Sequence, residues 1–169
     1  MKRFGIYICC WLCTLLAFAQ ENKDWQAKAD NEACRTWVEE RLAKMSLKEK
    51  IGQLFIHTVA PLNTPQNRRN IADAVKEYKV GGLLFSGGEL MNQVVLTNYA
   101  QELAEIPLMM TFDGEWGLAM RLKNTPAFPK NRVLGCIQDN RLIYEYGKEV
   151  ARQCREIGVH VNFAPVADV

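Results

Sequence analysis

Two carboxylates and an arginine stand close together near the middle of the chain, in the stretch MTFDGEWGLAMRLKNTPAFP that begins at Met110. Asp113 and Glu115 follow directly on an apolar run, and Arg121 comes shortly after them. Carboxylate and guanidinium groups form charge-assisted hydrogen bonds, which are roughly twice as strong as neutral ones. These residue types at the end of a strand fit either a solvated turn or a site that binds the hydroxyl groups of a sugar.

Each of these side chains also has an ordinary structural explanation. Asp113 fits a turn or helix cap as well as a site, although the apolar strand before it favours a carboxylate aimed at a ligand. Arg121 fits an exposed or ion-paired surface residue, and Glu115 fits a structural partner for a nearby arginine. Trp116 fits a rim or core position as well as a platform for a sugar ring. The composition of this stretch alone leaves these alternatives open.

An alternation of apolar strands and amphipathic helices must position this stretch. The spacing of apolar residues predicts strands at 53–59, 80–86, 108–112 and 159–164, and helices at 64–78, 91–103 and 139–157. Such alternation indicates right-handed βαβ units and a parallel sheet, so the fold class is α/β. A doubly wound sheet and a (β/α)8 barrel both fit. Because a complete barrel needs about 250 residues, a barrel would be present here as its N-terminal half.

Polar residues gather where the predicted strands end. In parallel α/β folds the ligand lies at the carboxyl ends of the strands. These ends carry, in chain order, Thr58, Ser86 to Gly88, Asp113 to Glu115, and Asp168. The long segment 114–137 after the third strand strengthens the case, because long loops in compact domains are more often functional than idle.

The first 19 residues are predicted to be a secretory signal peptide and not part of the fold. A Lys-Arg pair precedes an apolar run over 6–18, and a small-x-small cleavage site ends at Ala19. The run is shorter than the roughly 20 residues that span a membrane. We therefore expect no membrane span and an exported mature chain, in a bacterial periplasm or at the cell surface.

The charge of the mature chain argues against a nucleic-acid partner. The sequence has 21 basic and 19 acidic residues, and two basic residues leave with the signal peptide, so the mature chain is neutral. A nucleic-acid-binding domain usually carries a basic excess. Three cysteines remain in the mature chain, Cys34, Cys136 and Cys154. Their odd number and spacing predict no disulfide framework.

Neither a metal nor a cofactor is predicted. The two histidines, His57 and His160, lie within predicted strands, and no Cys/His/Asp cluster has the spacing of metal ligands. The glycine pairs match no phosphate-binding motif, and no nucleophile elbow is present. Because side chains alternate along a strand, His160 and Asn162 are expected to share a polar face opposite Val159 and Val161.

Four stretches of the chain together resemble the N-terminal barrel of glycoside hydrolase family 3. They are MSLKEKIGQLF, VGGLLFSGG, PLMMTFDGEWGLAMRL with the following Phe-Pro, and GVHVNFAPVADV. The last is the most specific, since Asn-Phe-Ala-Pro-Val-x-Asp-Val at the fourth βα unit is hard to obtain by chance. The resemblance implies a partial barrel domain at 46–169, which follows the predicted signal peptide at 1–19 and a lead-in with a first helix at 20–45. It is closer to the β-N-acetylglucosaminidase branch than to the β-glucosidase branch.

The resemblance implies roles for three residues in binding a carbohydrate substrate. Asp113 matches the family aspartate that binds sugar hydroxyls in the subsite before the cleaved bond. Arg121 matches a motif arginine near that site, and Asp168 ends the strand before the loop that completes the sugar pocket. Trp116 departs from the pattern, because relatives often have glycine there.

The resemblance also implies a reaction, which is hydrolysis of terminal β-linked sugars with retention. In such enzymes a carboxylate attacks to form a glycosyl-enzyme, and a second group protonates the leaving oxygen. In the N-acetylglucosaminidase branch a histidine paired with an aspartate takes the place of the usual acid. The family carries these groups on later strands, so no catalytic residue is predicted before Val169, and the chain alone is expected to cleave no glycoside.

The first prediction is therefore a β-N-acetylhexosaminidase, and other functions stay open. One is a β-glucosidase of the same family. Another is an exported sugar-binding fragment without catalysis. A barrel oxidoreductase with a phosphorylated cofactor is disfavoured by export and by the missing phosphate motif.

Overall fold

The computed structural model describes residues 31–166 of the chain. The predicted signal peptide and Asp168 lie outside these residues, so both keep the status of predictions. The chain divides into two units, one ending at Met45 and the other beginning at Ser46, and each is described by itself.

The first unit contributes one helix, α2 (Glu32–Lys44), as its spacing predicts. The side chain of Asn31 caps this helix by accepting a hydrogen bond of 2.8 Å from the backbone N–H of Cys34. The guanidinium of Arg41 lies 5.6 Å from the ring centroid of Trp37, within cation–π range. No residue of α2 is buried, so its cap and such local contacts define it.

The second unit opens with the helix α3 (Leu47–Gly52), which begins with a capping box formed by Ser46 and Glu49. The backbone N–H of Glu49 donates to Ser46 Oγ at 3.3 Å, and the backbone N–H of Ser46 donates to Glu49 Oε2 at 2.8 Å. This exchange satisfies two of the amides that a helix start leaves free.

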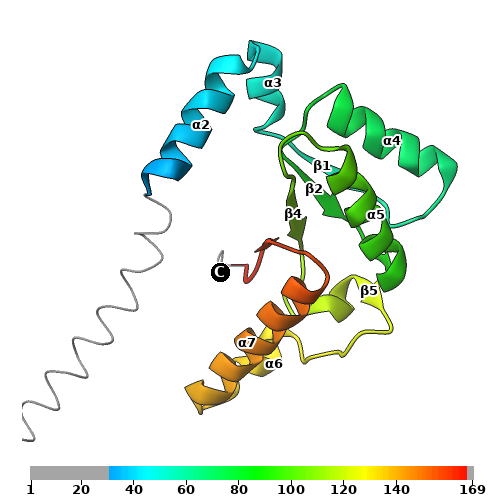
Figure 1. Cartoon of the computed structure of the whole chain (residues 1–169). Helices are drawn as coiled ribbons and strands as arrows, with labels where there is room; N and C mark the ends of the chain where they lie inside the picture. The colour runs from blue at the N-terminus through cyan, green and yellow to red at the C-terminus, as the bar shows by residue number, and fades with distance from the viewer. Residues whose placement is uncertain (1–30, 167–169) are drawn as a thin grey trace, which may run out of the picture. The chain divides into compact units, whose positions relative to one another are not determined.

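A sheet of four parallel strands forms the centre of the second unit, in the order β1-β2-β4-β6 (Figure 1). The strands are β1 (Ile56–Val59), β2 (Gly82–Phe85), β4 (Met109–Phe112) and β6 (Val161–Asn162). Their order in space is their order in the chain, without the reversal that a doubly wound sheet requires. The structure therefore confirms the α/β fold with a parallel sheet that corresponds to part of a barrel.

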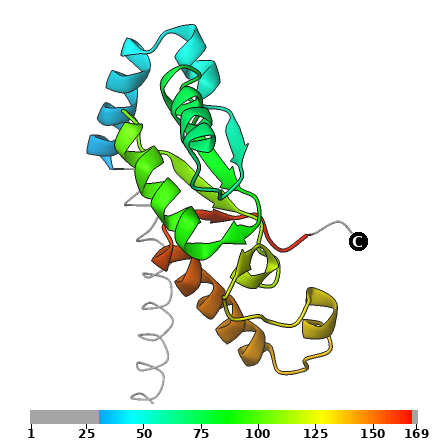
Figure 2. The same ribbon diagram turned by 90° about the vertical axis from the view of Figure 1, so that its right-hand side faces the viewer.

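Three helices connect these strands: α4 (Pro65–Lys76), α5 (Leu90–Leu103) and α7 (Asn140–Glu156). Figure 2 shows α7 in orange leading into β6 in red. Thr64 caps α4 and Asp139 caps α7, at the starts of the predicted helices, by accepting hydrogen bonds from backbone amides of the first turn. None of the helices over residues 31–166 combines the length and the apolar character that crossing a bilayer needs.

The strands are shorter than predicted, because turns and caps take their first residues. The predicted first strand began at Gln53, but Gln53 is the C-cap of α3, and its backbone N–H donates to Glu49 C=O. The segment 114–137 also holds elements that were not predicted. They are the 3-10 helix η1 (Leu118–Met120), the strand β5 (Leu122–Lys123), which pairs with β3 (Gly88–Glu89), and the helix α6 (Asn131–Leu134).

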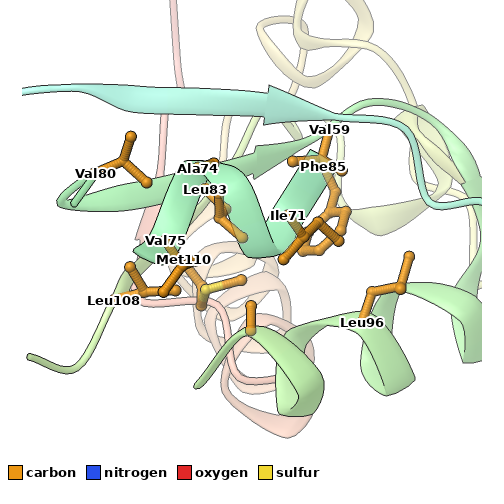
Figure 3. Packing of buried hydrophobic residues seen from close by; sticks show 11 residues of the cluster. Val59, Ile71, Ala74, Val75, Val80, Leu83, Phe85, Leu96, Leu108 and Met110 are labelled. Carbon is orange, nitrogen blue, oxygen red and sulfur yellow. The ribbon is translucent and has the colours of Figure 1, made fainter. Parts of the chain in front are cut away.

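Two apolar clusters hold the helices on the sheet. The first joins β2 and β4 to α4 and α5 (Figure 3) and contains Val59, Ile71, Ala74, Val75, Val80, Leu83, Phe85, Leu96, Ala100, Leu108 and Met110. The second lies under α7 and contains Phe112, Leu118, Leu122, Val150, Cys154, Ile157 and Val159. Full burial of each large apolar side chain contributes about 1.5–3 kcal/mol.

The opposite face of the sheet is open and partly apolar. Ile56 and Met109 both lie opposite Gly82 in the strand register, so their side chains share this face, where they are 41% and 50% exposed. Phe163, directly after β6, is 48% exposed. In a complete barrel this face would point to the interior, which side chains fill.

Candidate functional site

Asp113 and Arg121, predicted separately from the sequence, form an ion pair at the carboxyl end of β4. Arg121 Nη2 binds Asp113 Oδ2 directly, and Arg121 Nε donates to the backbone C=O of Asp113 at 3.2 Å. The side chain of Arg121 remains 38% exposed and that of Asp113 33% exposed. The guanidinium thus fixes the carboxylate while leaving it accessible to a ligand.

The glycine pair after β2 lets the backbone of Arg121 come close to the neighbouring strand end. Gly88 N–H donates to Arg121 C=O at 2.8 Å. A Cβ on Gly87 would lie only 2.7 Å from Arg121 O, and one on Gly88 only 2.4 Å from Pro61 Cγ. Pro61 follows β1, so the ends of three strands converge here, as their polar residues predicted.

The fourth strand reaches the same place through the side chain of Asn162. Its Oδ1 accepts from Gly114 N–H at 2.9 Å, and its Nδ2 donates to Gly114 C=O at 3.1 Å. His160 lies two residues earlier, and its Nδ1 accepts from Met110 N–H at 3.0 Å. Both side chains were expected in a polar layer, and they bind main-chain groups: His160 in β4 itself and Asn162 just beyond its end.

Glu115 was expected to pair with a nearby arginine, but residues of the two helices that follow it hold it instead. Its carboxylate accepts a hydrogen bond of 3.0 Å from Asn131 Nδ2, and its backbone C=O accepts one of 2.8 Å from the Tyr146 hydroxyl. Burial raises the pKa of Tyr146, and the nearby charge of Glu115 raises it further. Arg121, the arginine nearest in sequence, binds Asp113 instead.

Trp116 lies half-buried beside a lysine. Lys130 Nζ is 5.5 Å from the centroid of its ring, which is within cation–π range. One face of the indole is therefore covered, and a ligand could stack only on the other.

A hollow with a volume of about 700 Å³ lies on the α7 side of this loop. Its polar lining includes Glu115, Tyr146, His160 and Asn162, and α7 supplies much of its apolar wall. Asp113 and Arg121 do not line it. The strand-end site and this hollow are therefore different places.

The residues from 31 to 166 offer no group of three or more His, Cys, Asp or Glu side chains arranged to hold a metal ion. Within the same range, the strand-end site consists of carboxylate, guanidinium and backbone groups. These are hydrogen-bonding partners for a polar organic ligand.

Comparison with known proteins identifies the family. The model described as "Glycosyl hydrolase family 3 N terminal domain" matches residues 46–169. Beta-hexosaminidase LpqI of Mycobacterium tuberculosis is 30% identical over 139 residues, which are 75% of this chain and 32% of that protein. The Beta-N-acetylglucosaminidase/beta-glucosidase of Cellulomonas fimi is 23% identical over 133 residues, or 79% of this chain and 23% of that protein.

Two solved structures share the fold. Beta-glucoside phosphorylase BglX bound to 2FGlc has a TM-score of 0.67 at 19% identity, over 82% of this chain and 25% of its own. The beta-N-acetylglucosaminidase from Thermotoga maritima has a TM-score of 0.53 at 26% identity, over 69% of this chain and 25% of its own. The chain thus spans about a third or less of the length of these relatives. It belongs to glycosyl hydrolase family 3 and carries part of that family's N-terminal barrel domain.

Proposed function

We propose that this chain supplies the sugar-recognition part of a retaining glycoside hydrolase that acts on terminal β-linked N-acetylhexosamine. The observation that carries the proposal is the accessible Asp113–Arg121 pair at the carboxyl end of β4. It occupies the ligand end of a parallel sheet in a member of a glycosidase family. Several relatives are named as hexosaminidases.

The geometry of the pair suits recognition of sugar hydroxyls. Arg121 binds Oδ2 of Asp113 and the backbone oxygen of the same residue. Among residues 31–166 no hydrogen-bond donor reaches Asp113 Oδ1, so this oxygen is free to accept from a hydroxyl. A hydrogen bond to a charged group contributes about 1.5–3 kcal/mol, or about 10- to 150-fold in affinity.

Asp113 and Glu115 are not proposed as the catalytic carboxylates. A retaining mechanism needs one carboxylate free to attack the sugar and a second group to protonate the leaving oxygen. Asp113 is bound by Arg121, and Glu115 is bound by Asn131. We propose that the nucleophile and the acid come from parts of the family's barrel that follow Val169.

A β-glucosidase is the second candidate, because the Cellulomonas fimi relative is named for both activities. The two substrates differ at one ring position, where an acetamido group replaces a hydroxyl. We also propose that the protein is exported. The basic start, the apolar run and the cleavage site of the first 19 residues support this, and the N-terminal mass of the mature protein would test it.

Titration with sugars, followed by nuclear magnetic resonance or calorimetry, tests the proposed function. We expect N-acetylglucosamine to bind more tightly than glucose, and the Asp113→Asn variant to bind about 10- to 150-fold more weakly. The matched control is Asp139→Asn. Asp139 also pairs with an arginine, Arg141, but caps α7, and asparagine caps a helix equally well.

The outcomes separate the candidates. Equal affinity of Asp113→Asn and the unchanged protein would remove Asp113 from the site. Tighter binding of glucose would favour the β-glucosidase. Sugar binding without turnover of chromogenic β-glycosides, by a protein that includes the segment after Val169, would indicate a non-catalytic sugar-binding protein.

A further inference from the structure

The side chain of Asn162 is joined to the residue after Asp113 by two hydrogen bonds of opposite direction. Gly114 N–H donates to Asn162 Oδ1 at 2.9 Å, and Asn162 Nδ2 donates to Gly114 C=O at 3.1 Å. An asparagine amide offers a donor and an acceptor, as a peptide group does. It thus pairs with Gly114 as a neighbouring strand would.

This pairing continues the sheet beyond the point where the main-chain ladder stops. The parallel register of β4 and β6 ends with Phe112 opposite Asn162, and the Phe163 N–H donates to Phe112 C=O at 2.8 Å. Asp113 and Gly114 lie beyond this last rung. The Asn162 side chain therefore anchors the backbone at the position where Asp113 has just left the sheet.

Within the loop, Gly117 N–H also donates to Gly114 C=O at 3.1 Å, whereas Gly114 N–H is held by Asn162. The far end of the loop is fixed by the hydrogen bond from Gly88 N–H to Arg121 C=O. Tyr146 holds Glu115, one residue further from Asp113 than the Asn162 contact. Gly114 itself is buried against the Phe112 ring, so its peptide must keep one orientation, and the Asn162 amide sets it.

We infer that Asn162 is a positioning residue, which directs the Asp113 carboxylate toward Arg121 and toward the sugar. This inference rests on the proposed function of Asp113. Asn162 acts through the backbone of Gly114, and its two side-chain hydrogen bonds go to that residue and not to the ion pair. A positioning role differs from general support of the fold. Replacement of Asn162 should displace the Asp113 carboxylate and leave the rest of the sheet unchanged.

The first test needs no sugar. Arg121 Nε donates to the backbone C=O of Asp113, so its Nε–H resonance in isotope-labelled protein reports whether the pair is in place. We expect Asn162→Leu, which removes both hydrogen bonds, to shift this resonance and to speed exchange of the Gly114 amide hydrogen. Tyr146→Phe is the matched control, because it removes one hydrogen bond to the same loop and keeps the ring.

The second test is a double-mutant cycle on sugar affinity. We expect Asn162→Leu to weaken binding of N-acetylglucosamine by up to the about 10- to 150-fold expected for Asp113→Asn, because a misdirected carboxylate loses the same charged hydrogen bond to the sugar. In the Asp113→Asn background the same change should have little further effect. A loss of equal size in both backgrounds would mean that Asn162 supports the fold only, and would overturn the inference.

Asn162→Asp provides a second variant should Asn162→Leu fail to fold. It keeps an acceptor for Gly114 N–H but replaces the donor by a charged oxygen that repels Gly114 C=O, so a shift of the Arg121 resonance and weaker sugar binding are expected here as well. An unchanged Arg121 Nε–H resonance in a folded variant overturns the inference whether or not a sugar binds. A shifted resonance in a protein that binds no sugar leaves the positioning role intact and refutes the proposed function instead.

Discussion

Adding a single methyl group at Gly114 should disturb both the core and the site. A Cβ built there would lie 2.6 Å from Phe112 Cε1, 2.7 Å from Phe112 Cδ1 and 3.0 Å from Gly117 O. The Phe112 ring is fully buried in the cluster under α7, so it cannot turn away without opening that cluster. Gly114 is not among the described glycines with a positive φ, which are Gly117 and Gly158. Crowding alone therefore sets the cost of Gly114→Ala.

Overpacking of this kind costs about 1–3 kcal/mol, a large part of the roughly 5–15 kcal/mol by which a domain is stable. With a urea slope of about 1–3 kcal/mol per molar, the unfolding midpoint should fall by on the order of 1 M. Gly147→Ala is the matched control. Nothing lies within 4 Å of its added Cβ, and alanine inside a helix is favoured over glycine by about 0.5–1 kcal/mol, so its midpoint should rise.

The measurement is urea unfolding followed by circular dichroism at low protein concentration. Phe112→Leu withdraws the two ring carbons and, in combination with Gly114→Ala, should recover part of the loss. A Gly114→Ala midpoint equal to or above that of the unchanged protein would refute the reasoning, because the ring would then yield at no cost.

Three further perturbations test other parts of the structure. Leu83→Ala, which truncates a fully buried side chain of β2, should cost about 2–5 kcal/mol in urea unfolding, and a loss below 1 kcal/mol would contradict the packing described. Hydrogen bonds from the Arg152 and Gln153 side chains lower the pKa of Glu149 from 4.5 to about 2. The ionised Glu149 therefore stabilises the fold above about pH 4.5, and this stabilisation is lost as the pH falls toward 2. Glu149→Gln should therefore flatten the pH dependence of stability in that window, whereas a curve parallel to that of the unchanged protein would speak against it. Burial raises the pKa of the Cys154 thiol, so iodoacetamide should label the exposed Cys34 and Cys136 first and Cys154 only on unfolding, and early labelling of Cys154 by mass spectrometry would exclude its burial.

Local sequence patterns predicted the helices well, because each helix start depends on a few adjacent residues. Ser46 and Glu49 satisfy each other's amides within one turn, and Thr64 and Asp139 cap their helices in the same local way. The order of the strands in the sheet could not be predicted from local patterns. The alternation of elements fitted a doubly wound sheet and a barrel equally, since the neighbour of each strand is set by packing between distant segments.

For the ion pair at the end of β4, the sequence singled out the two residues but not their contact. Asp113 and Arg121 stood out by residue type and spacing, but their direct pairing depends on the course of a loop that contains η1 and β5. Glu115 was expected to bind an arginine and binds Asn131, sixteen positions further on. Asn162 lies 48 residues from Gly114, and no periodicity in the sequence links the two.

The order of the strands has a consequence for how the chain is made. In the described sheet each new strand pairs with the strand synthesised just before it. The sheet can therefore grow one βα unit at a time as the chain lengthens, and the sequence separation between paired strands stays small. Short separations keep the entropy lost in closing each loop low, which favours fast folding. When β2, β4 and β6 of this sheet are each translated, the strand that they pair with has already been made.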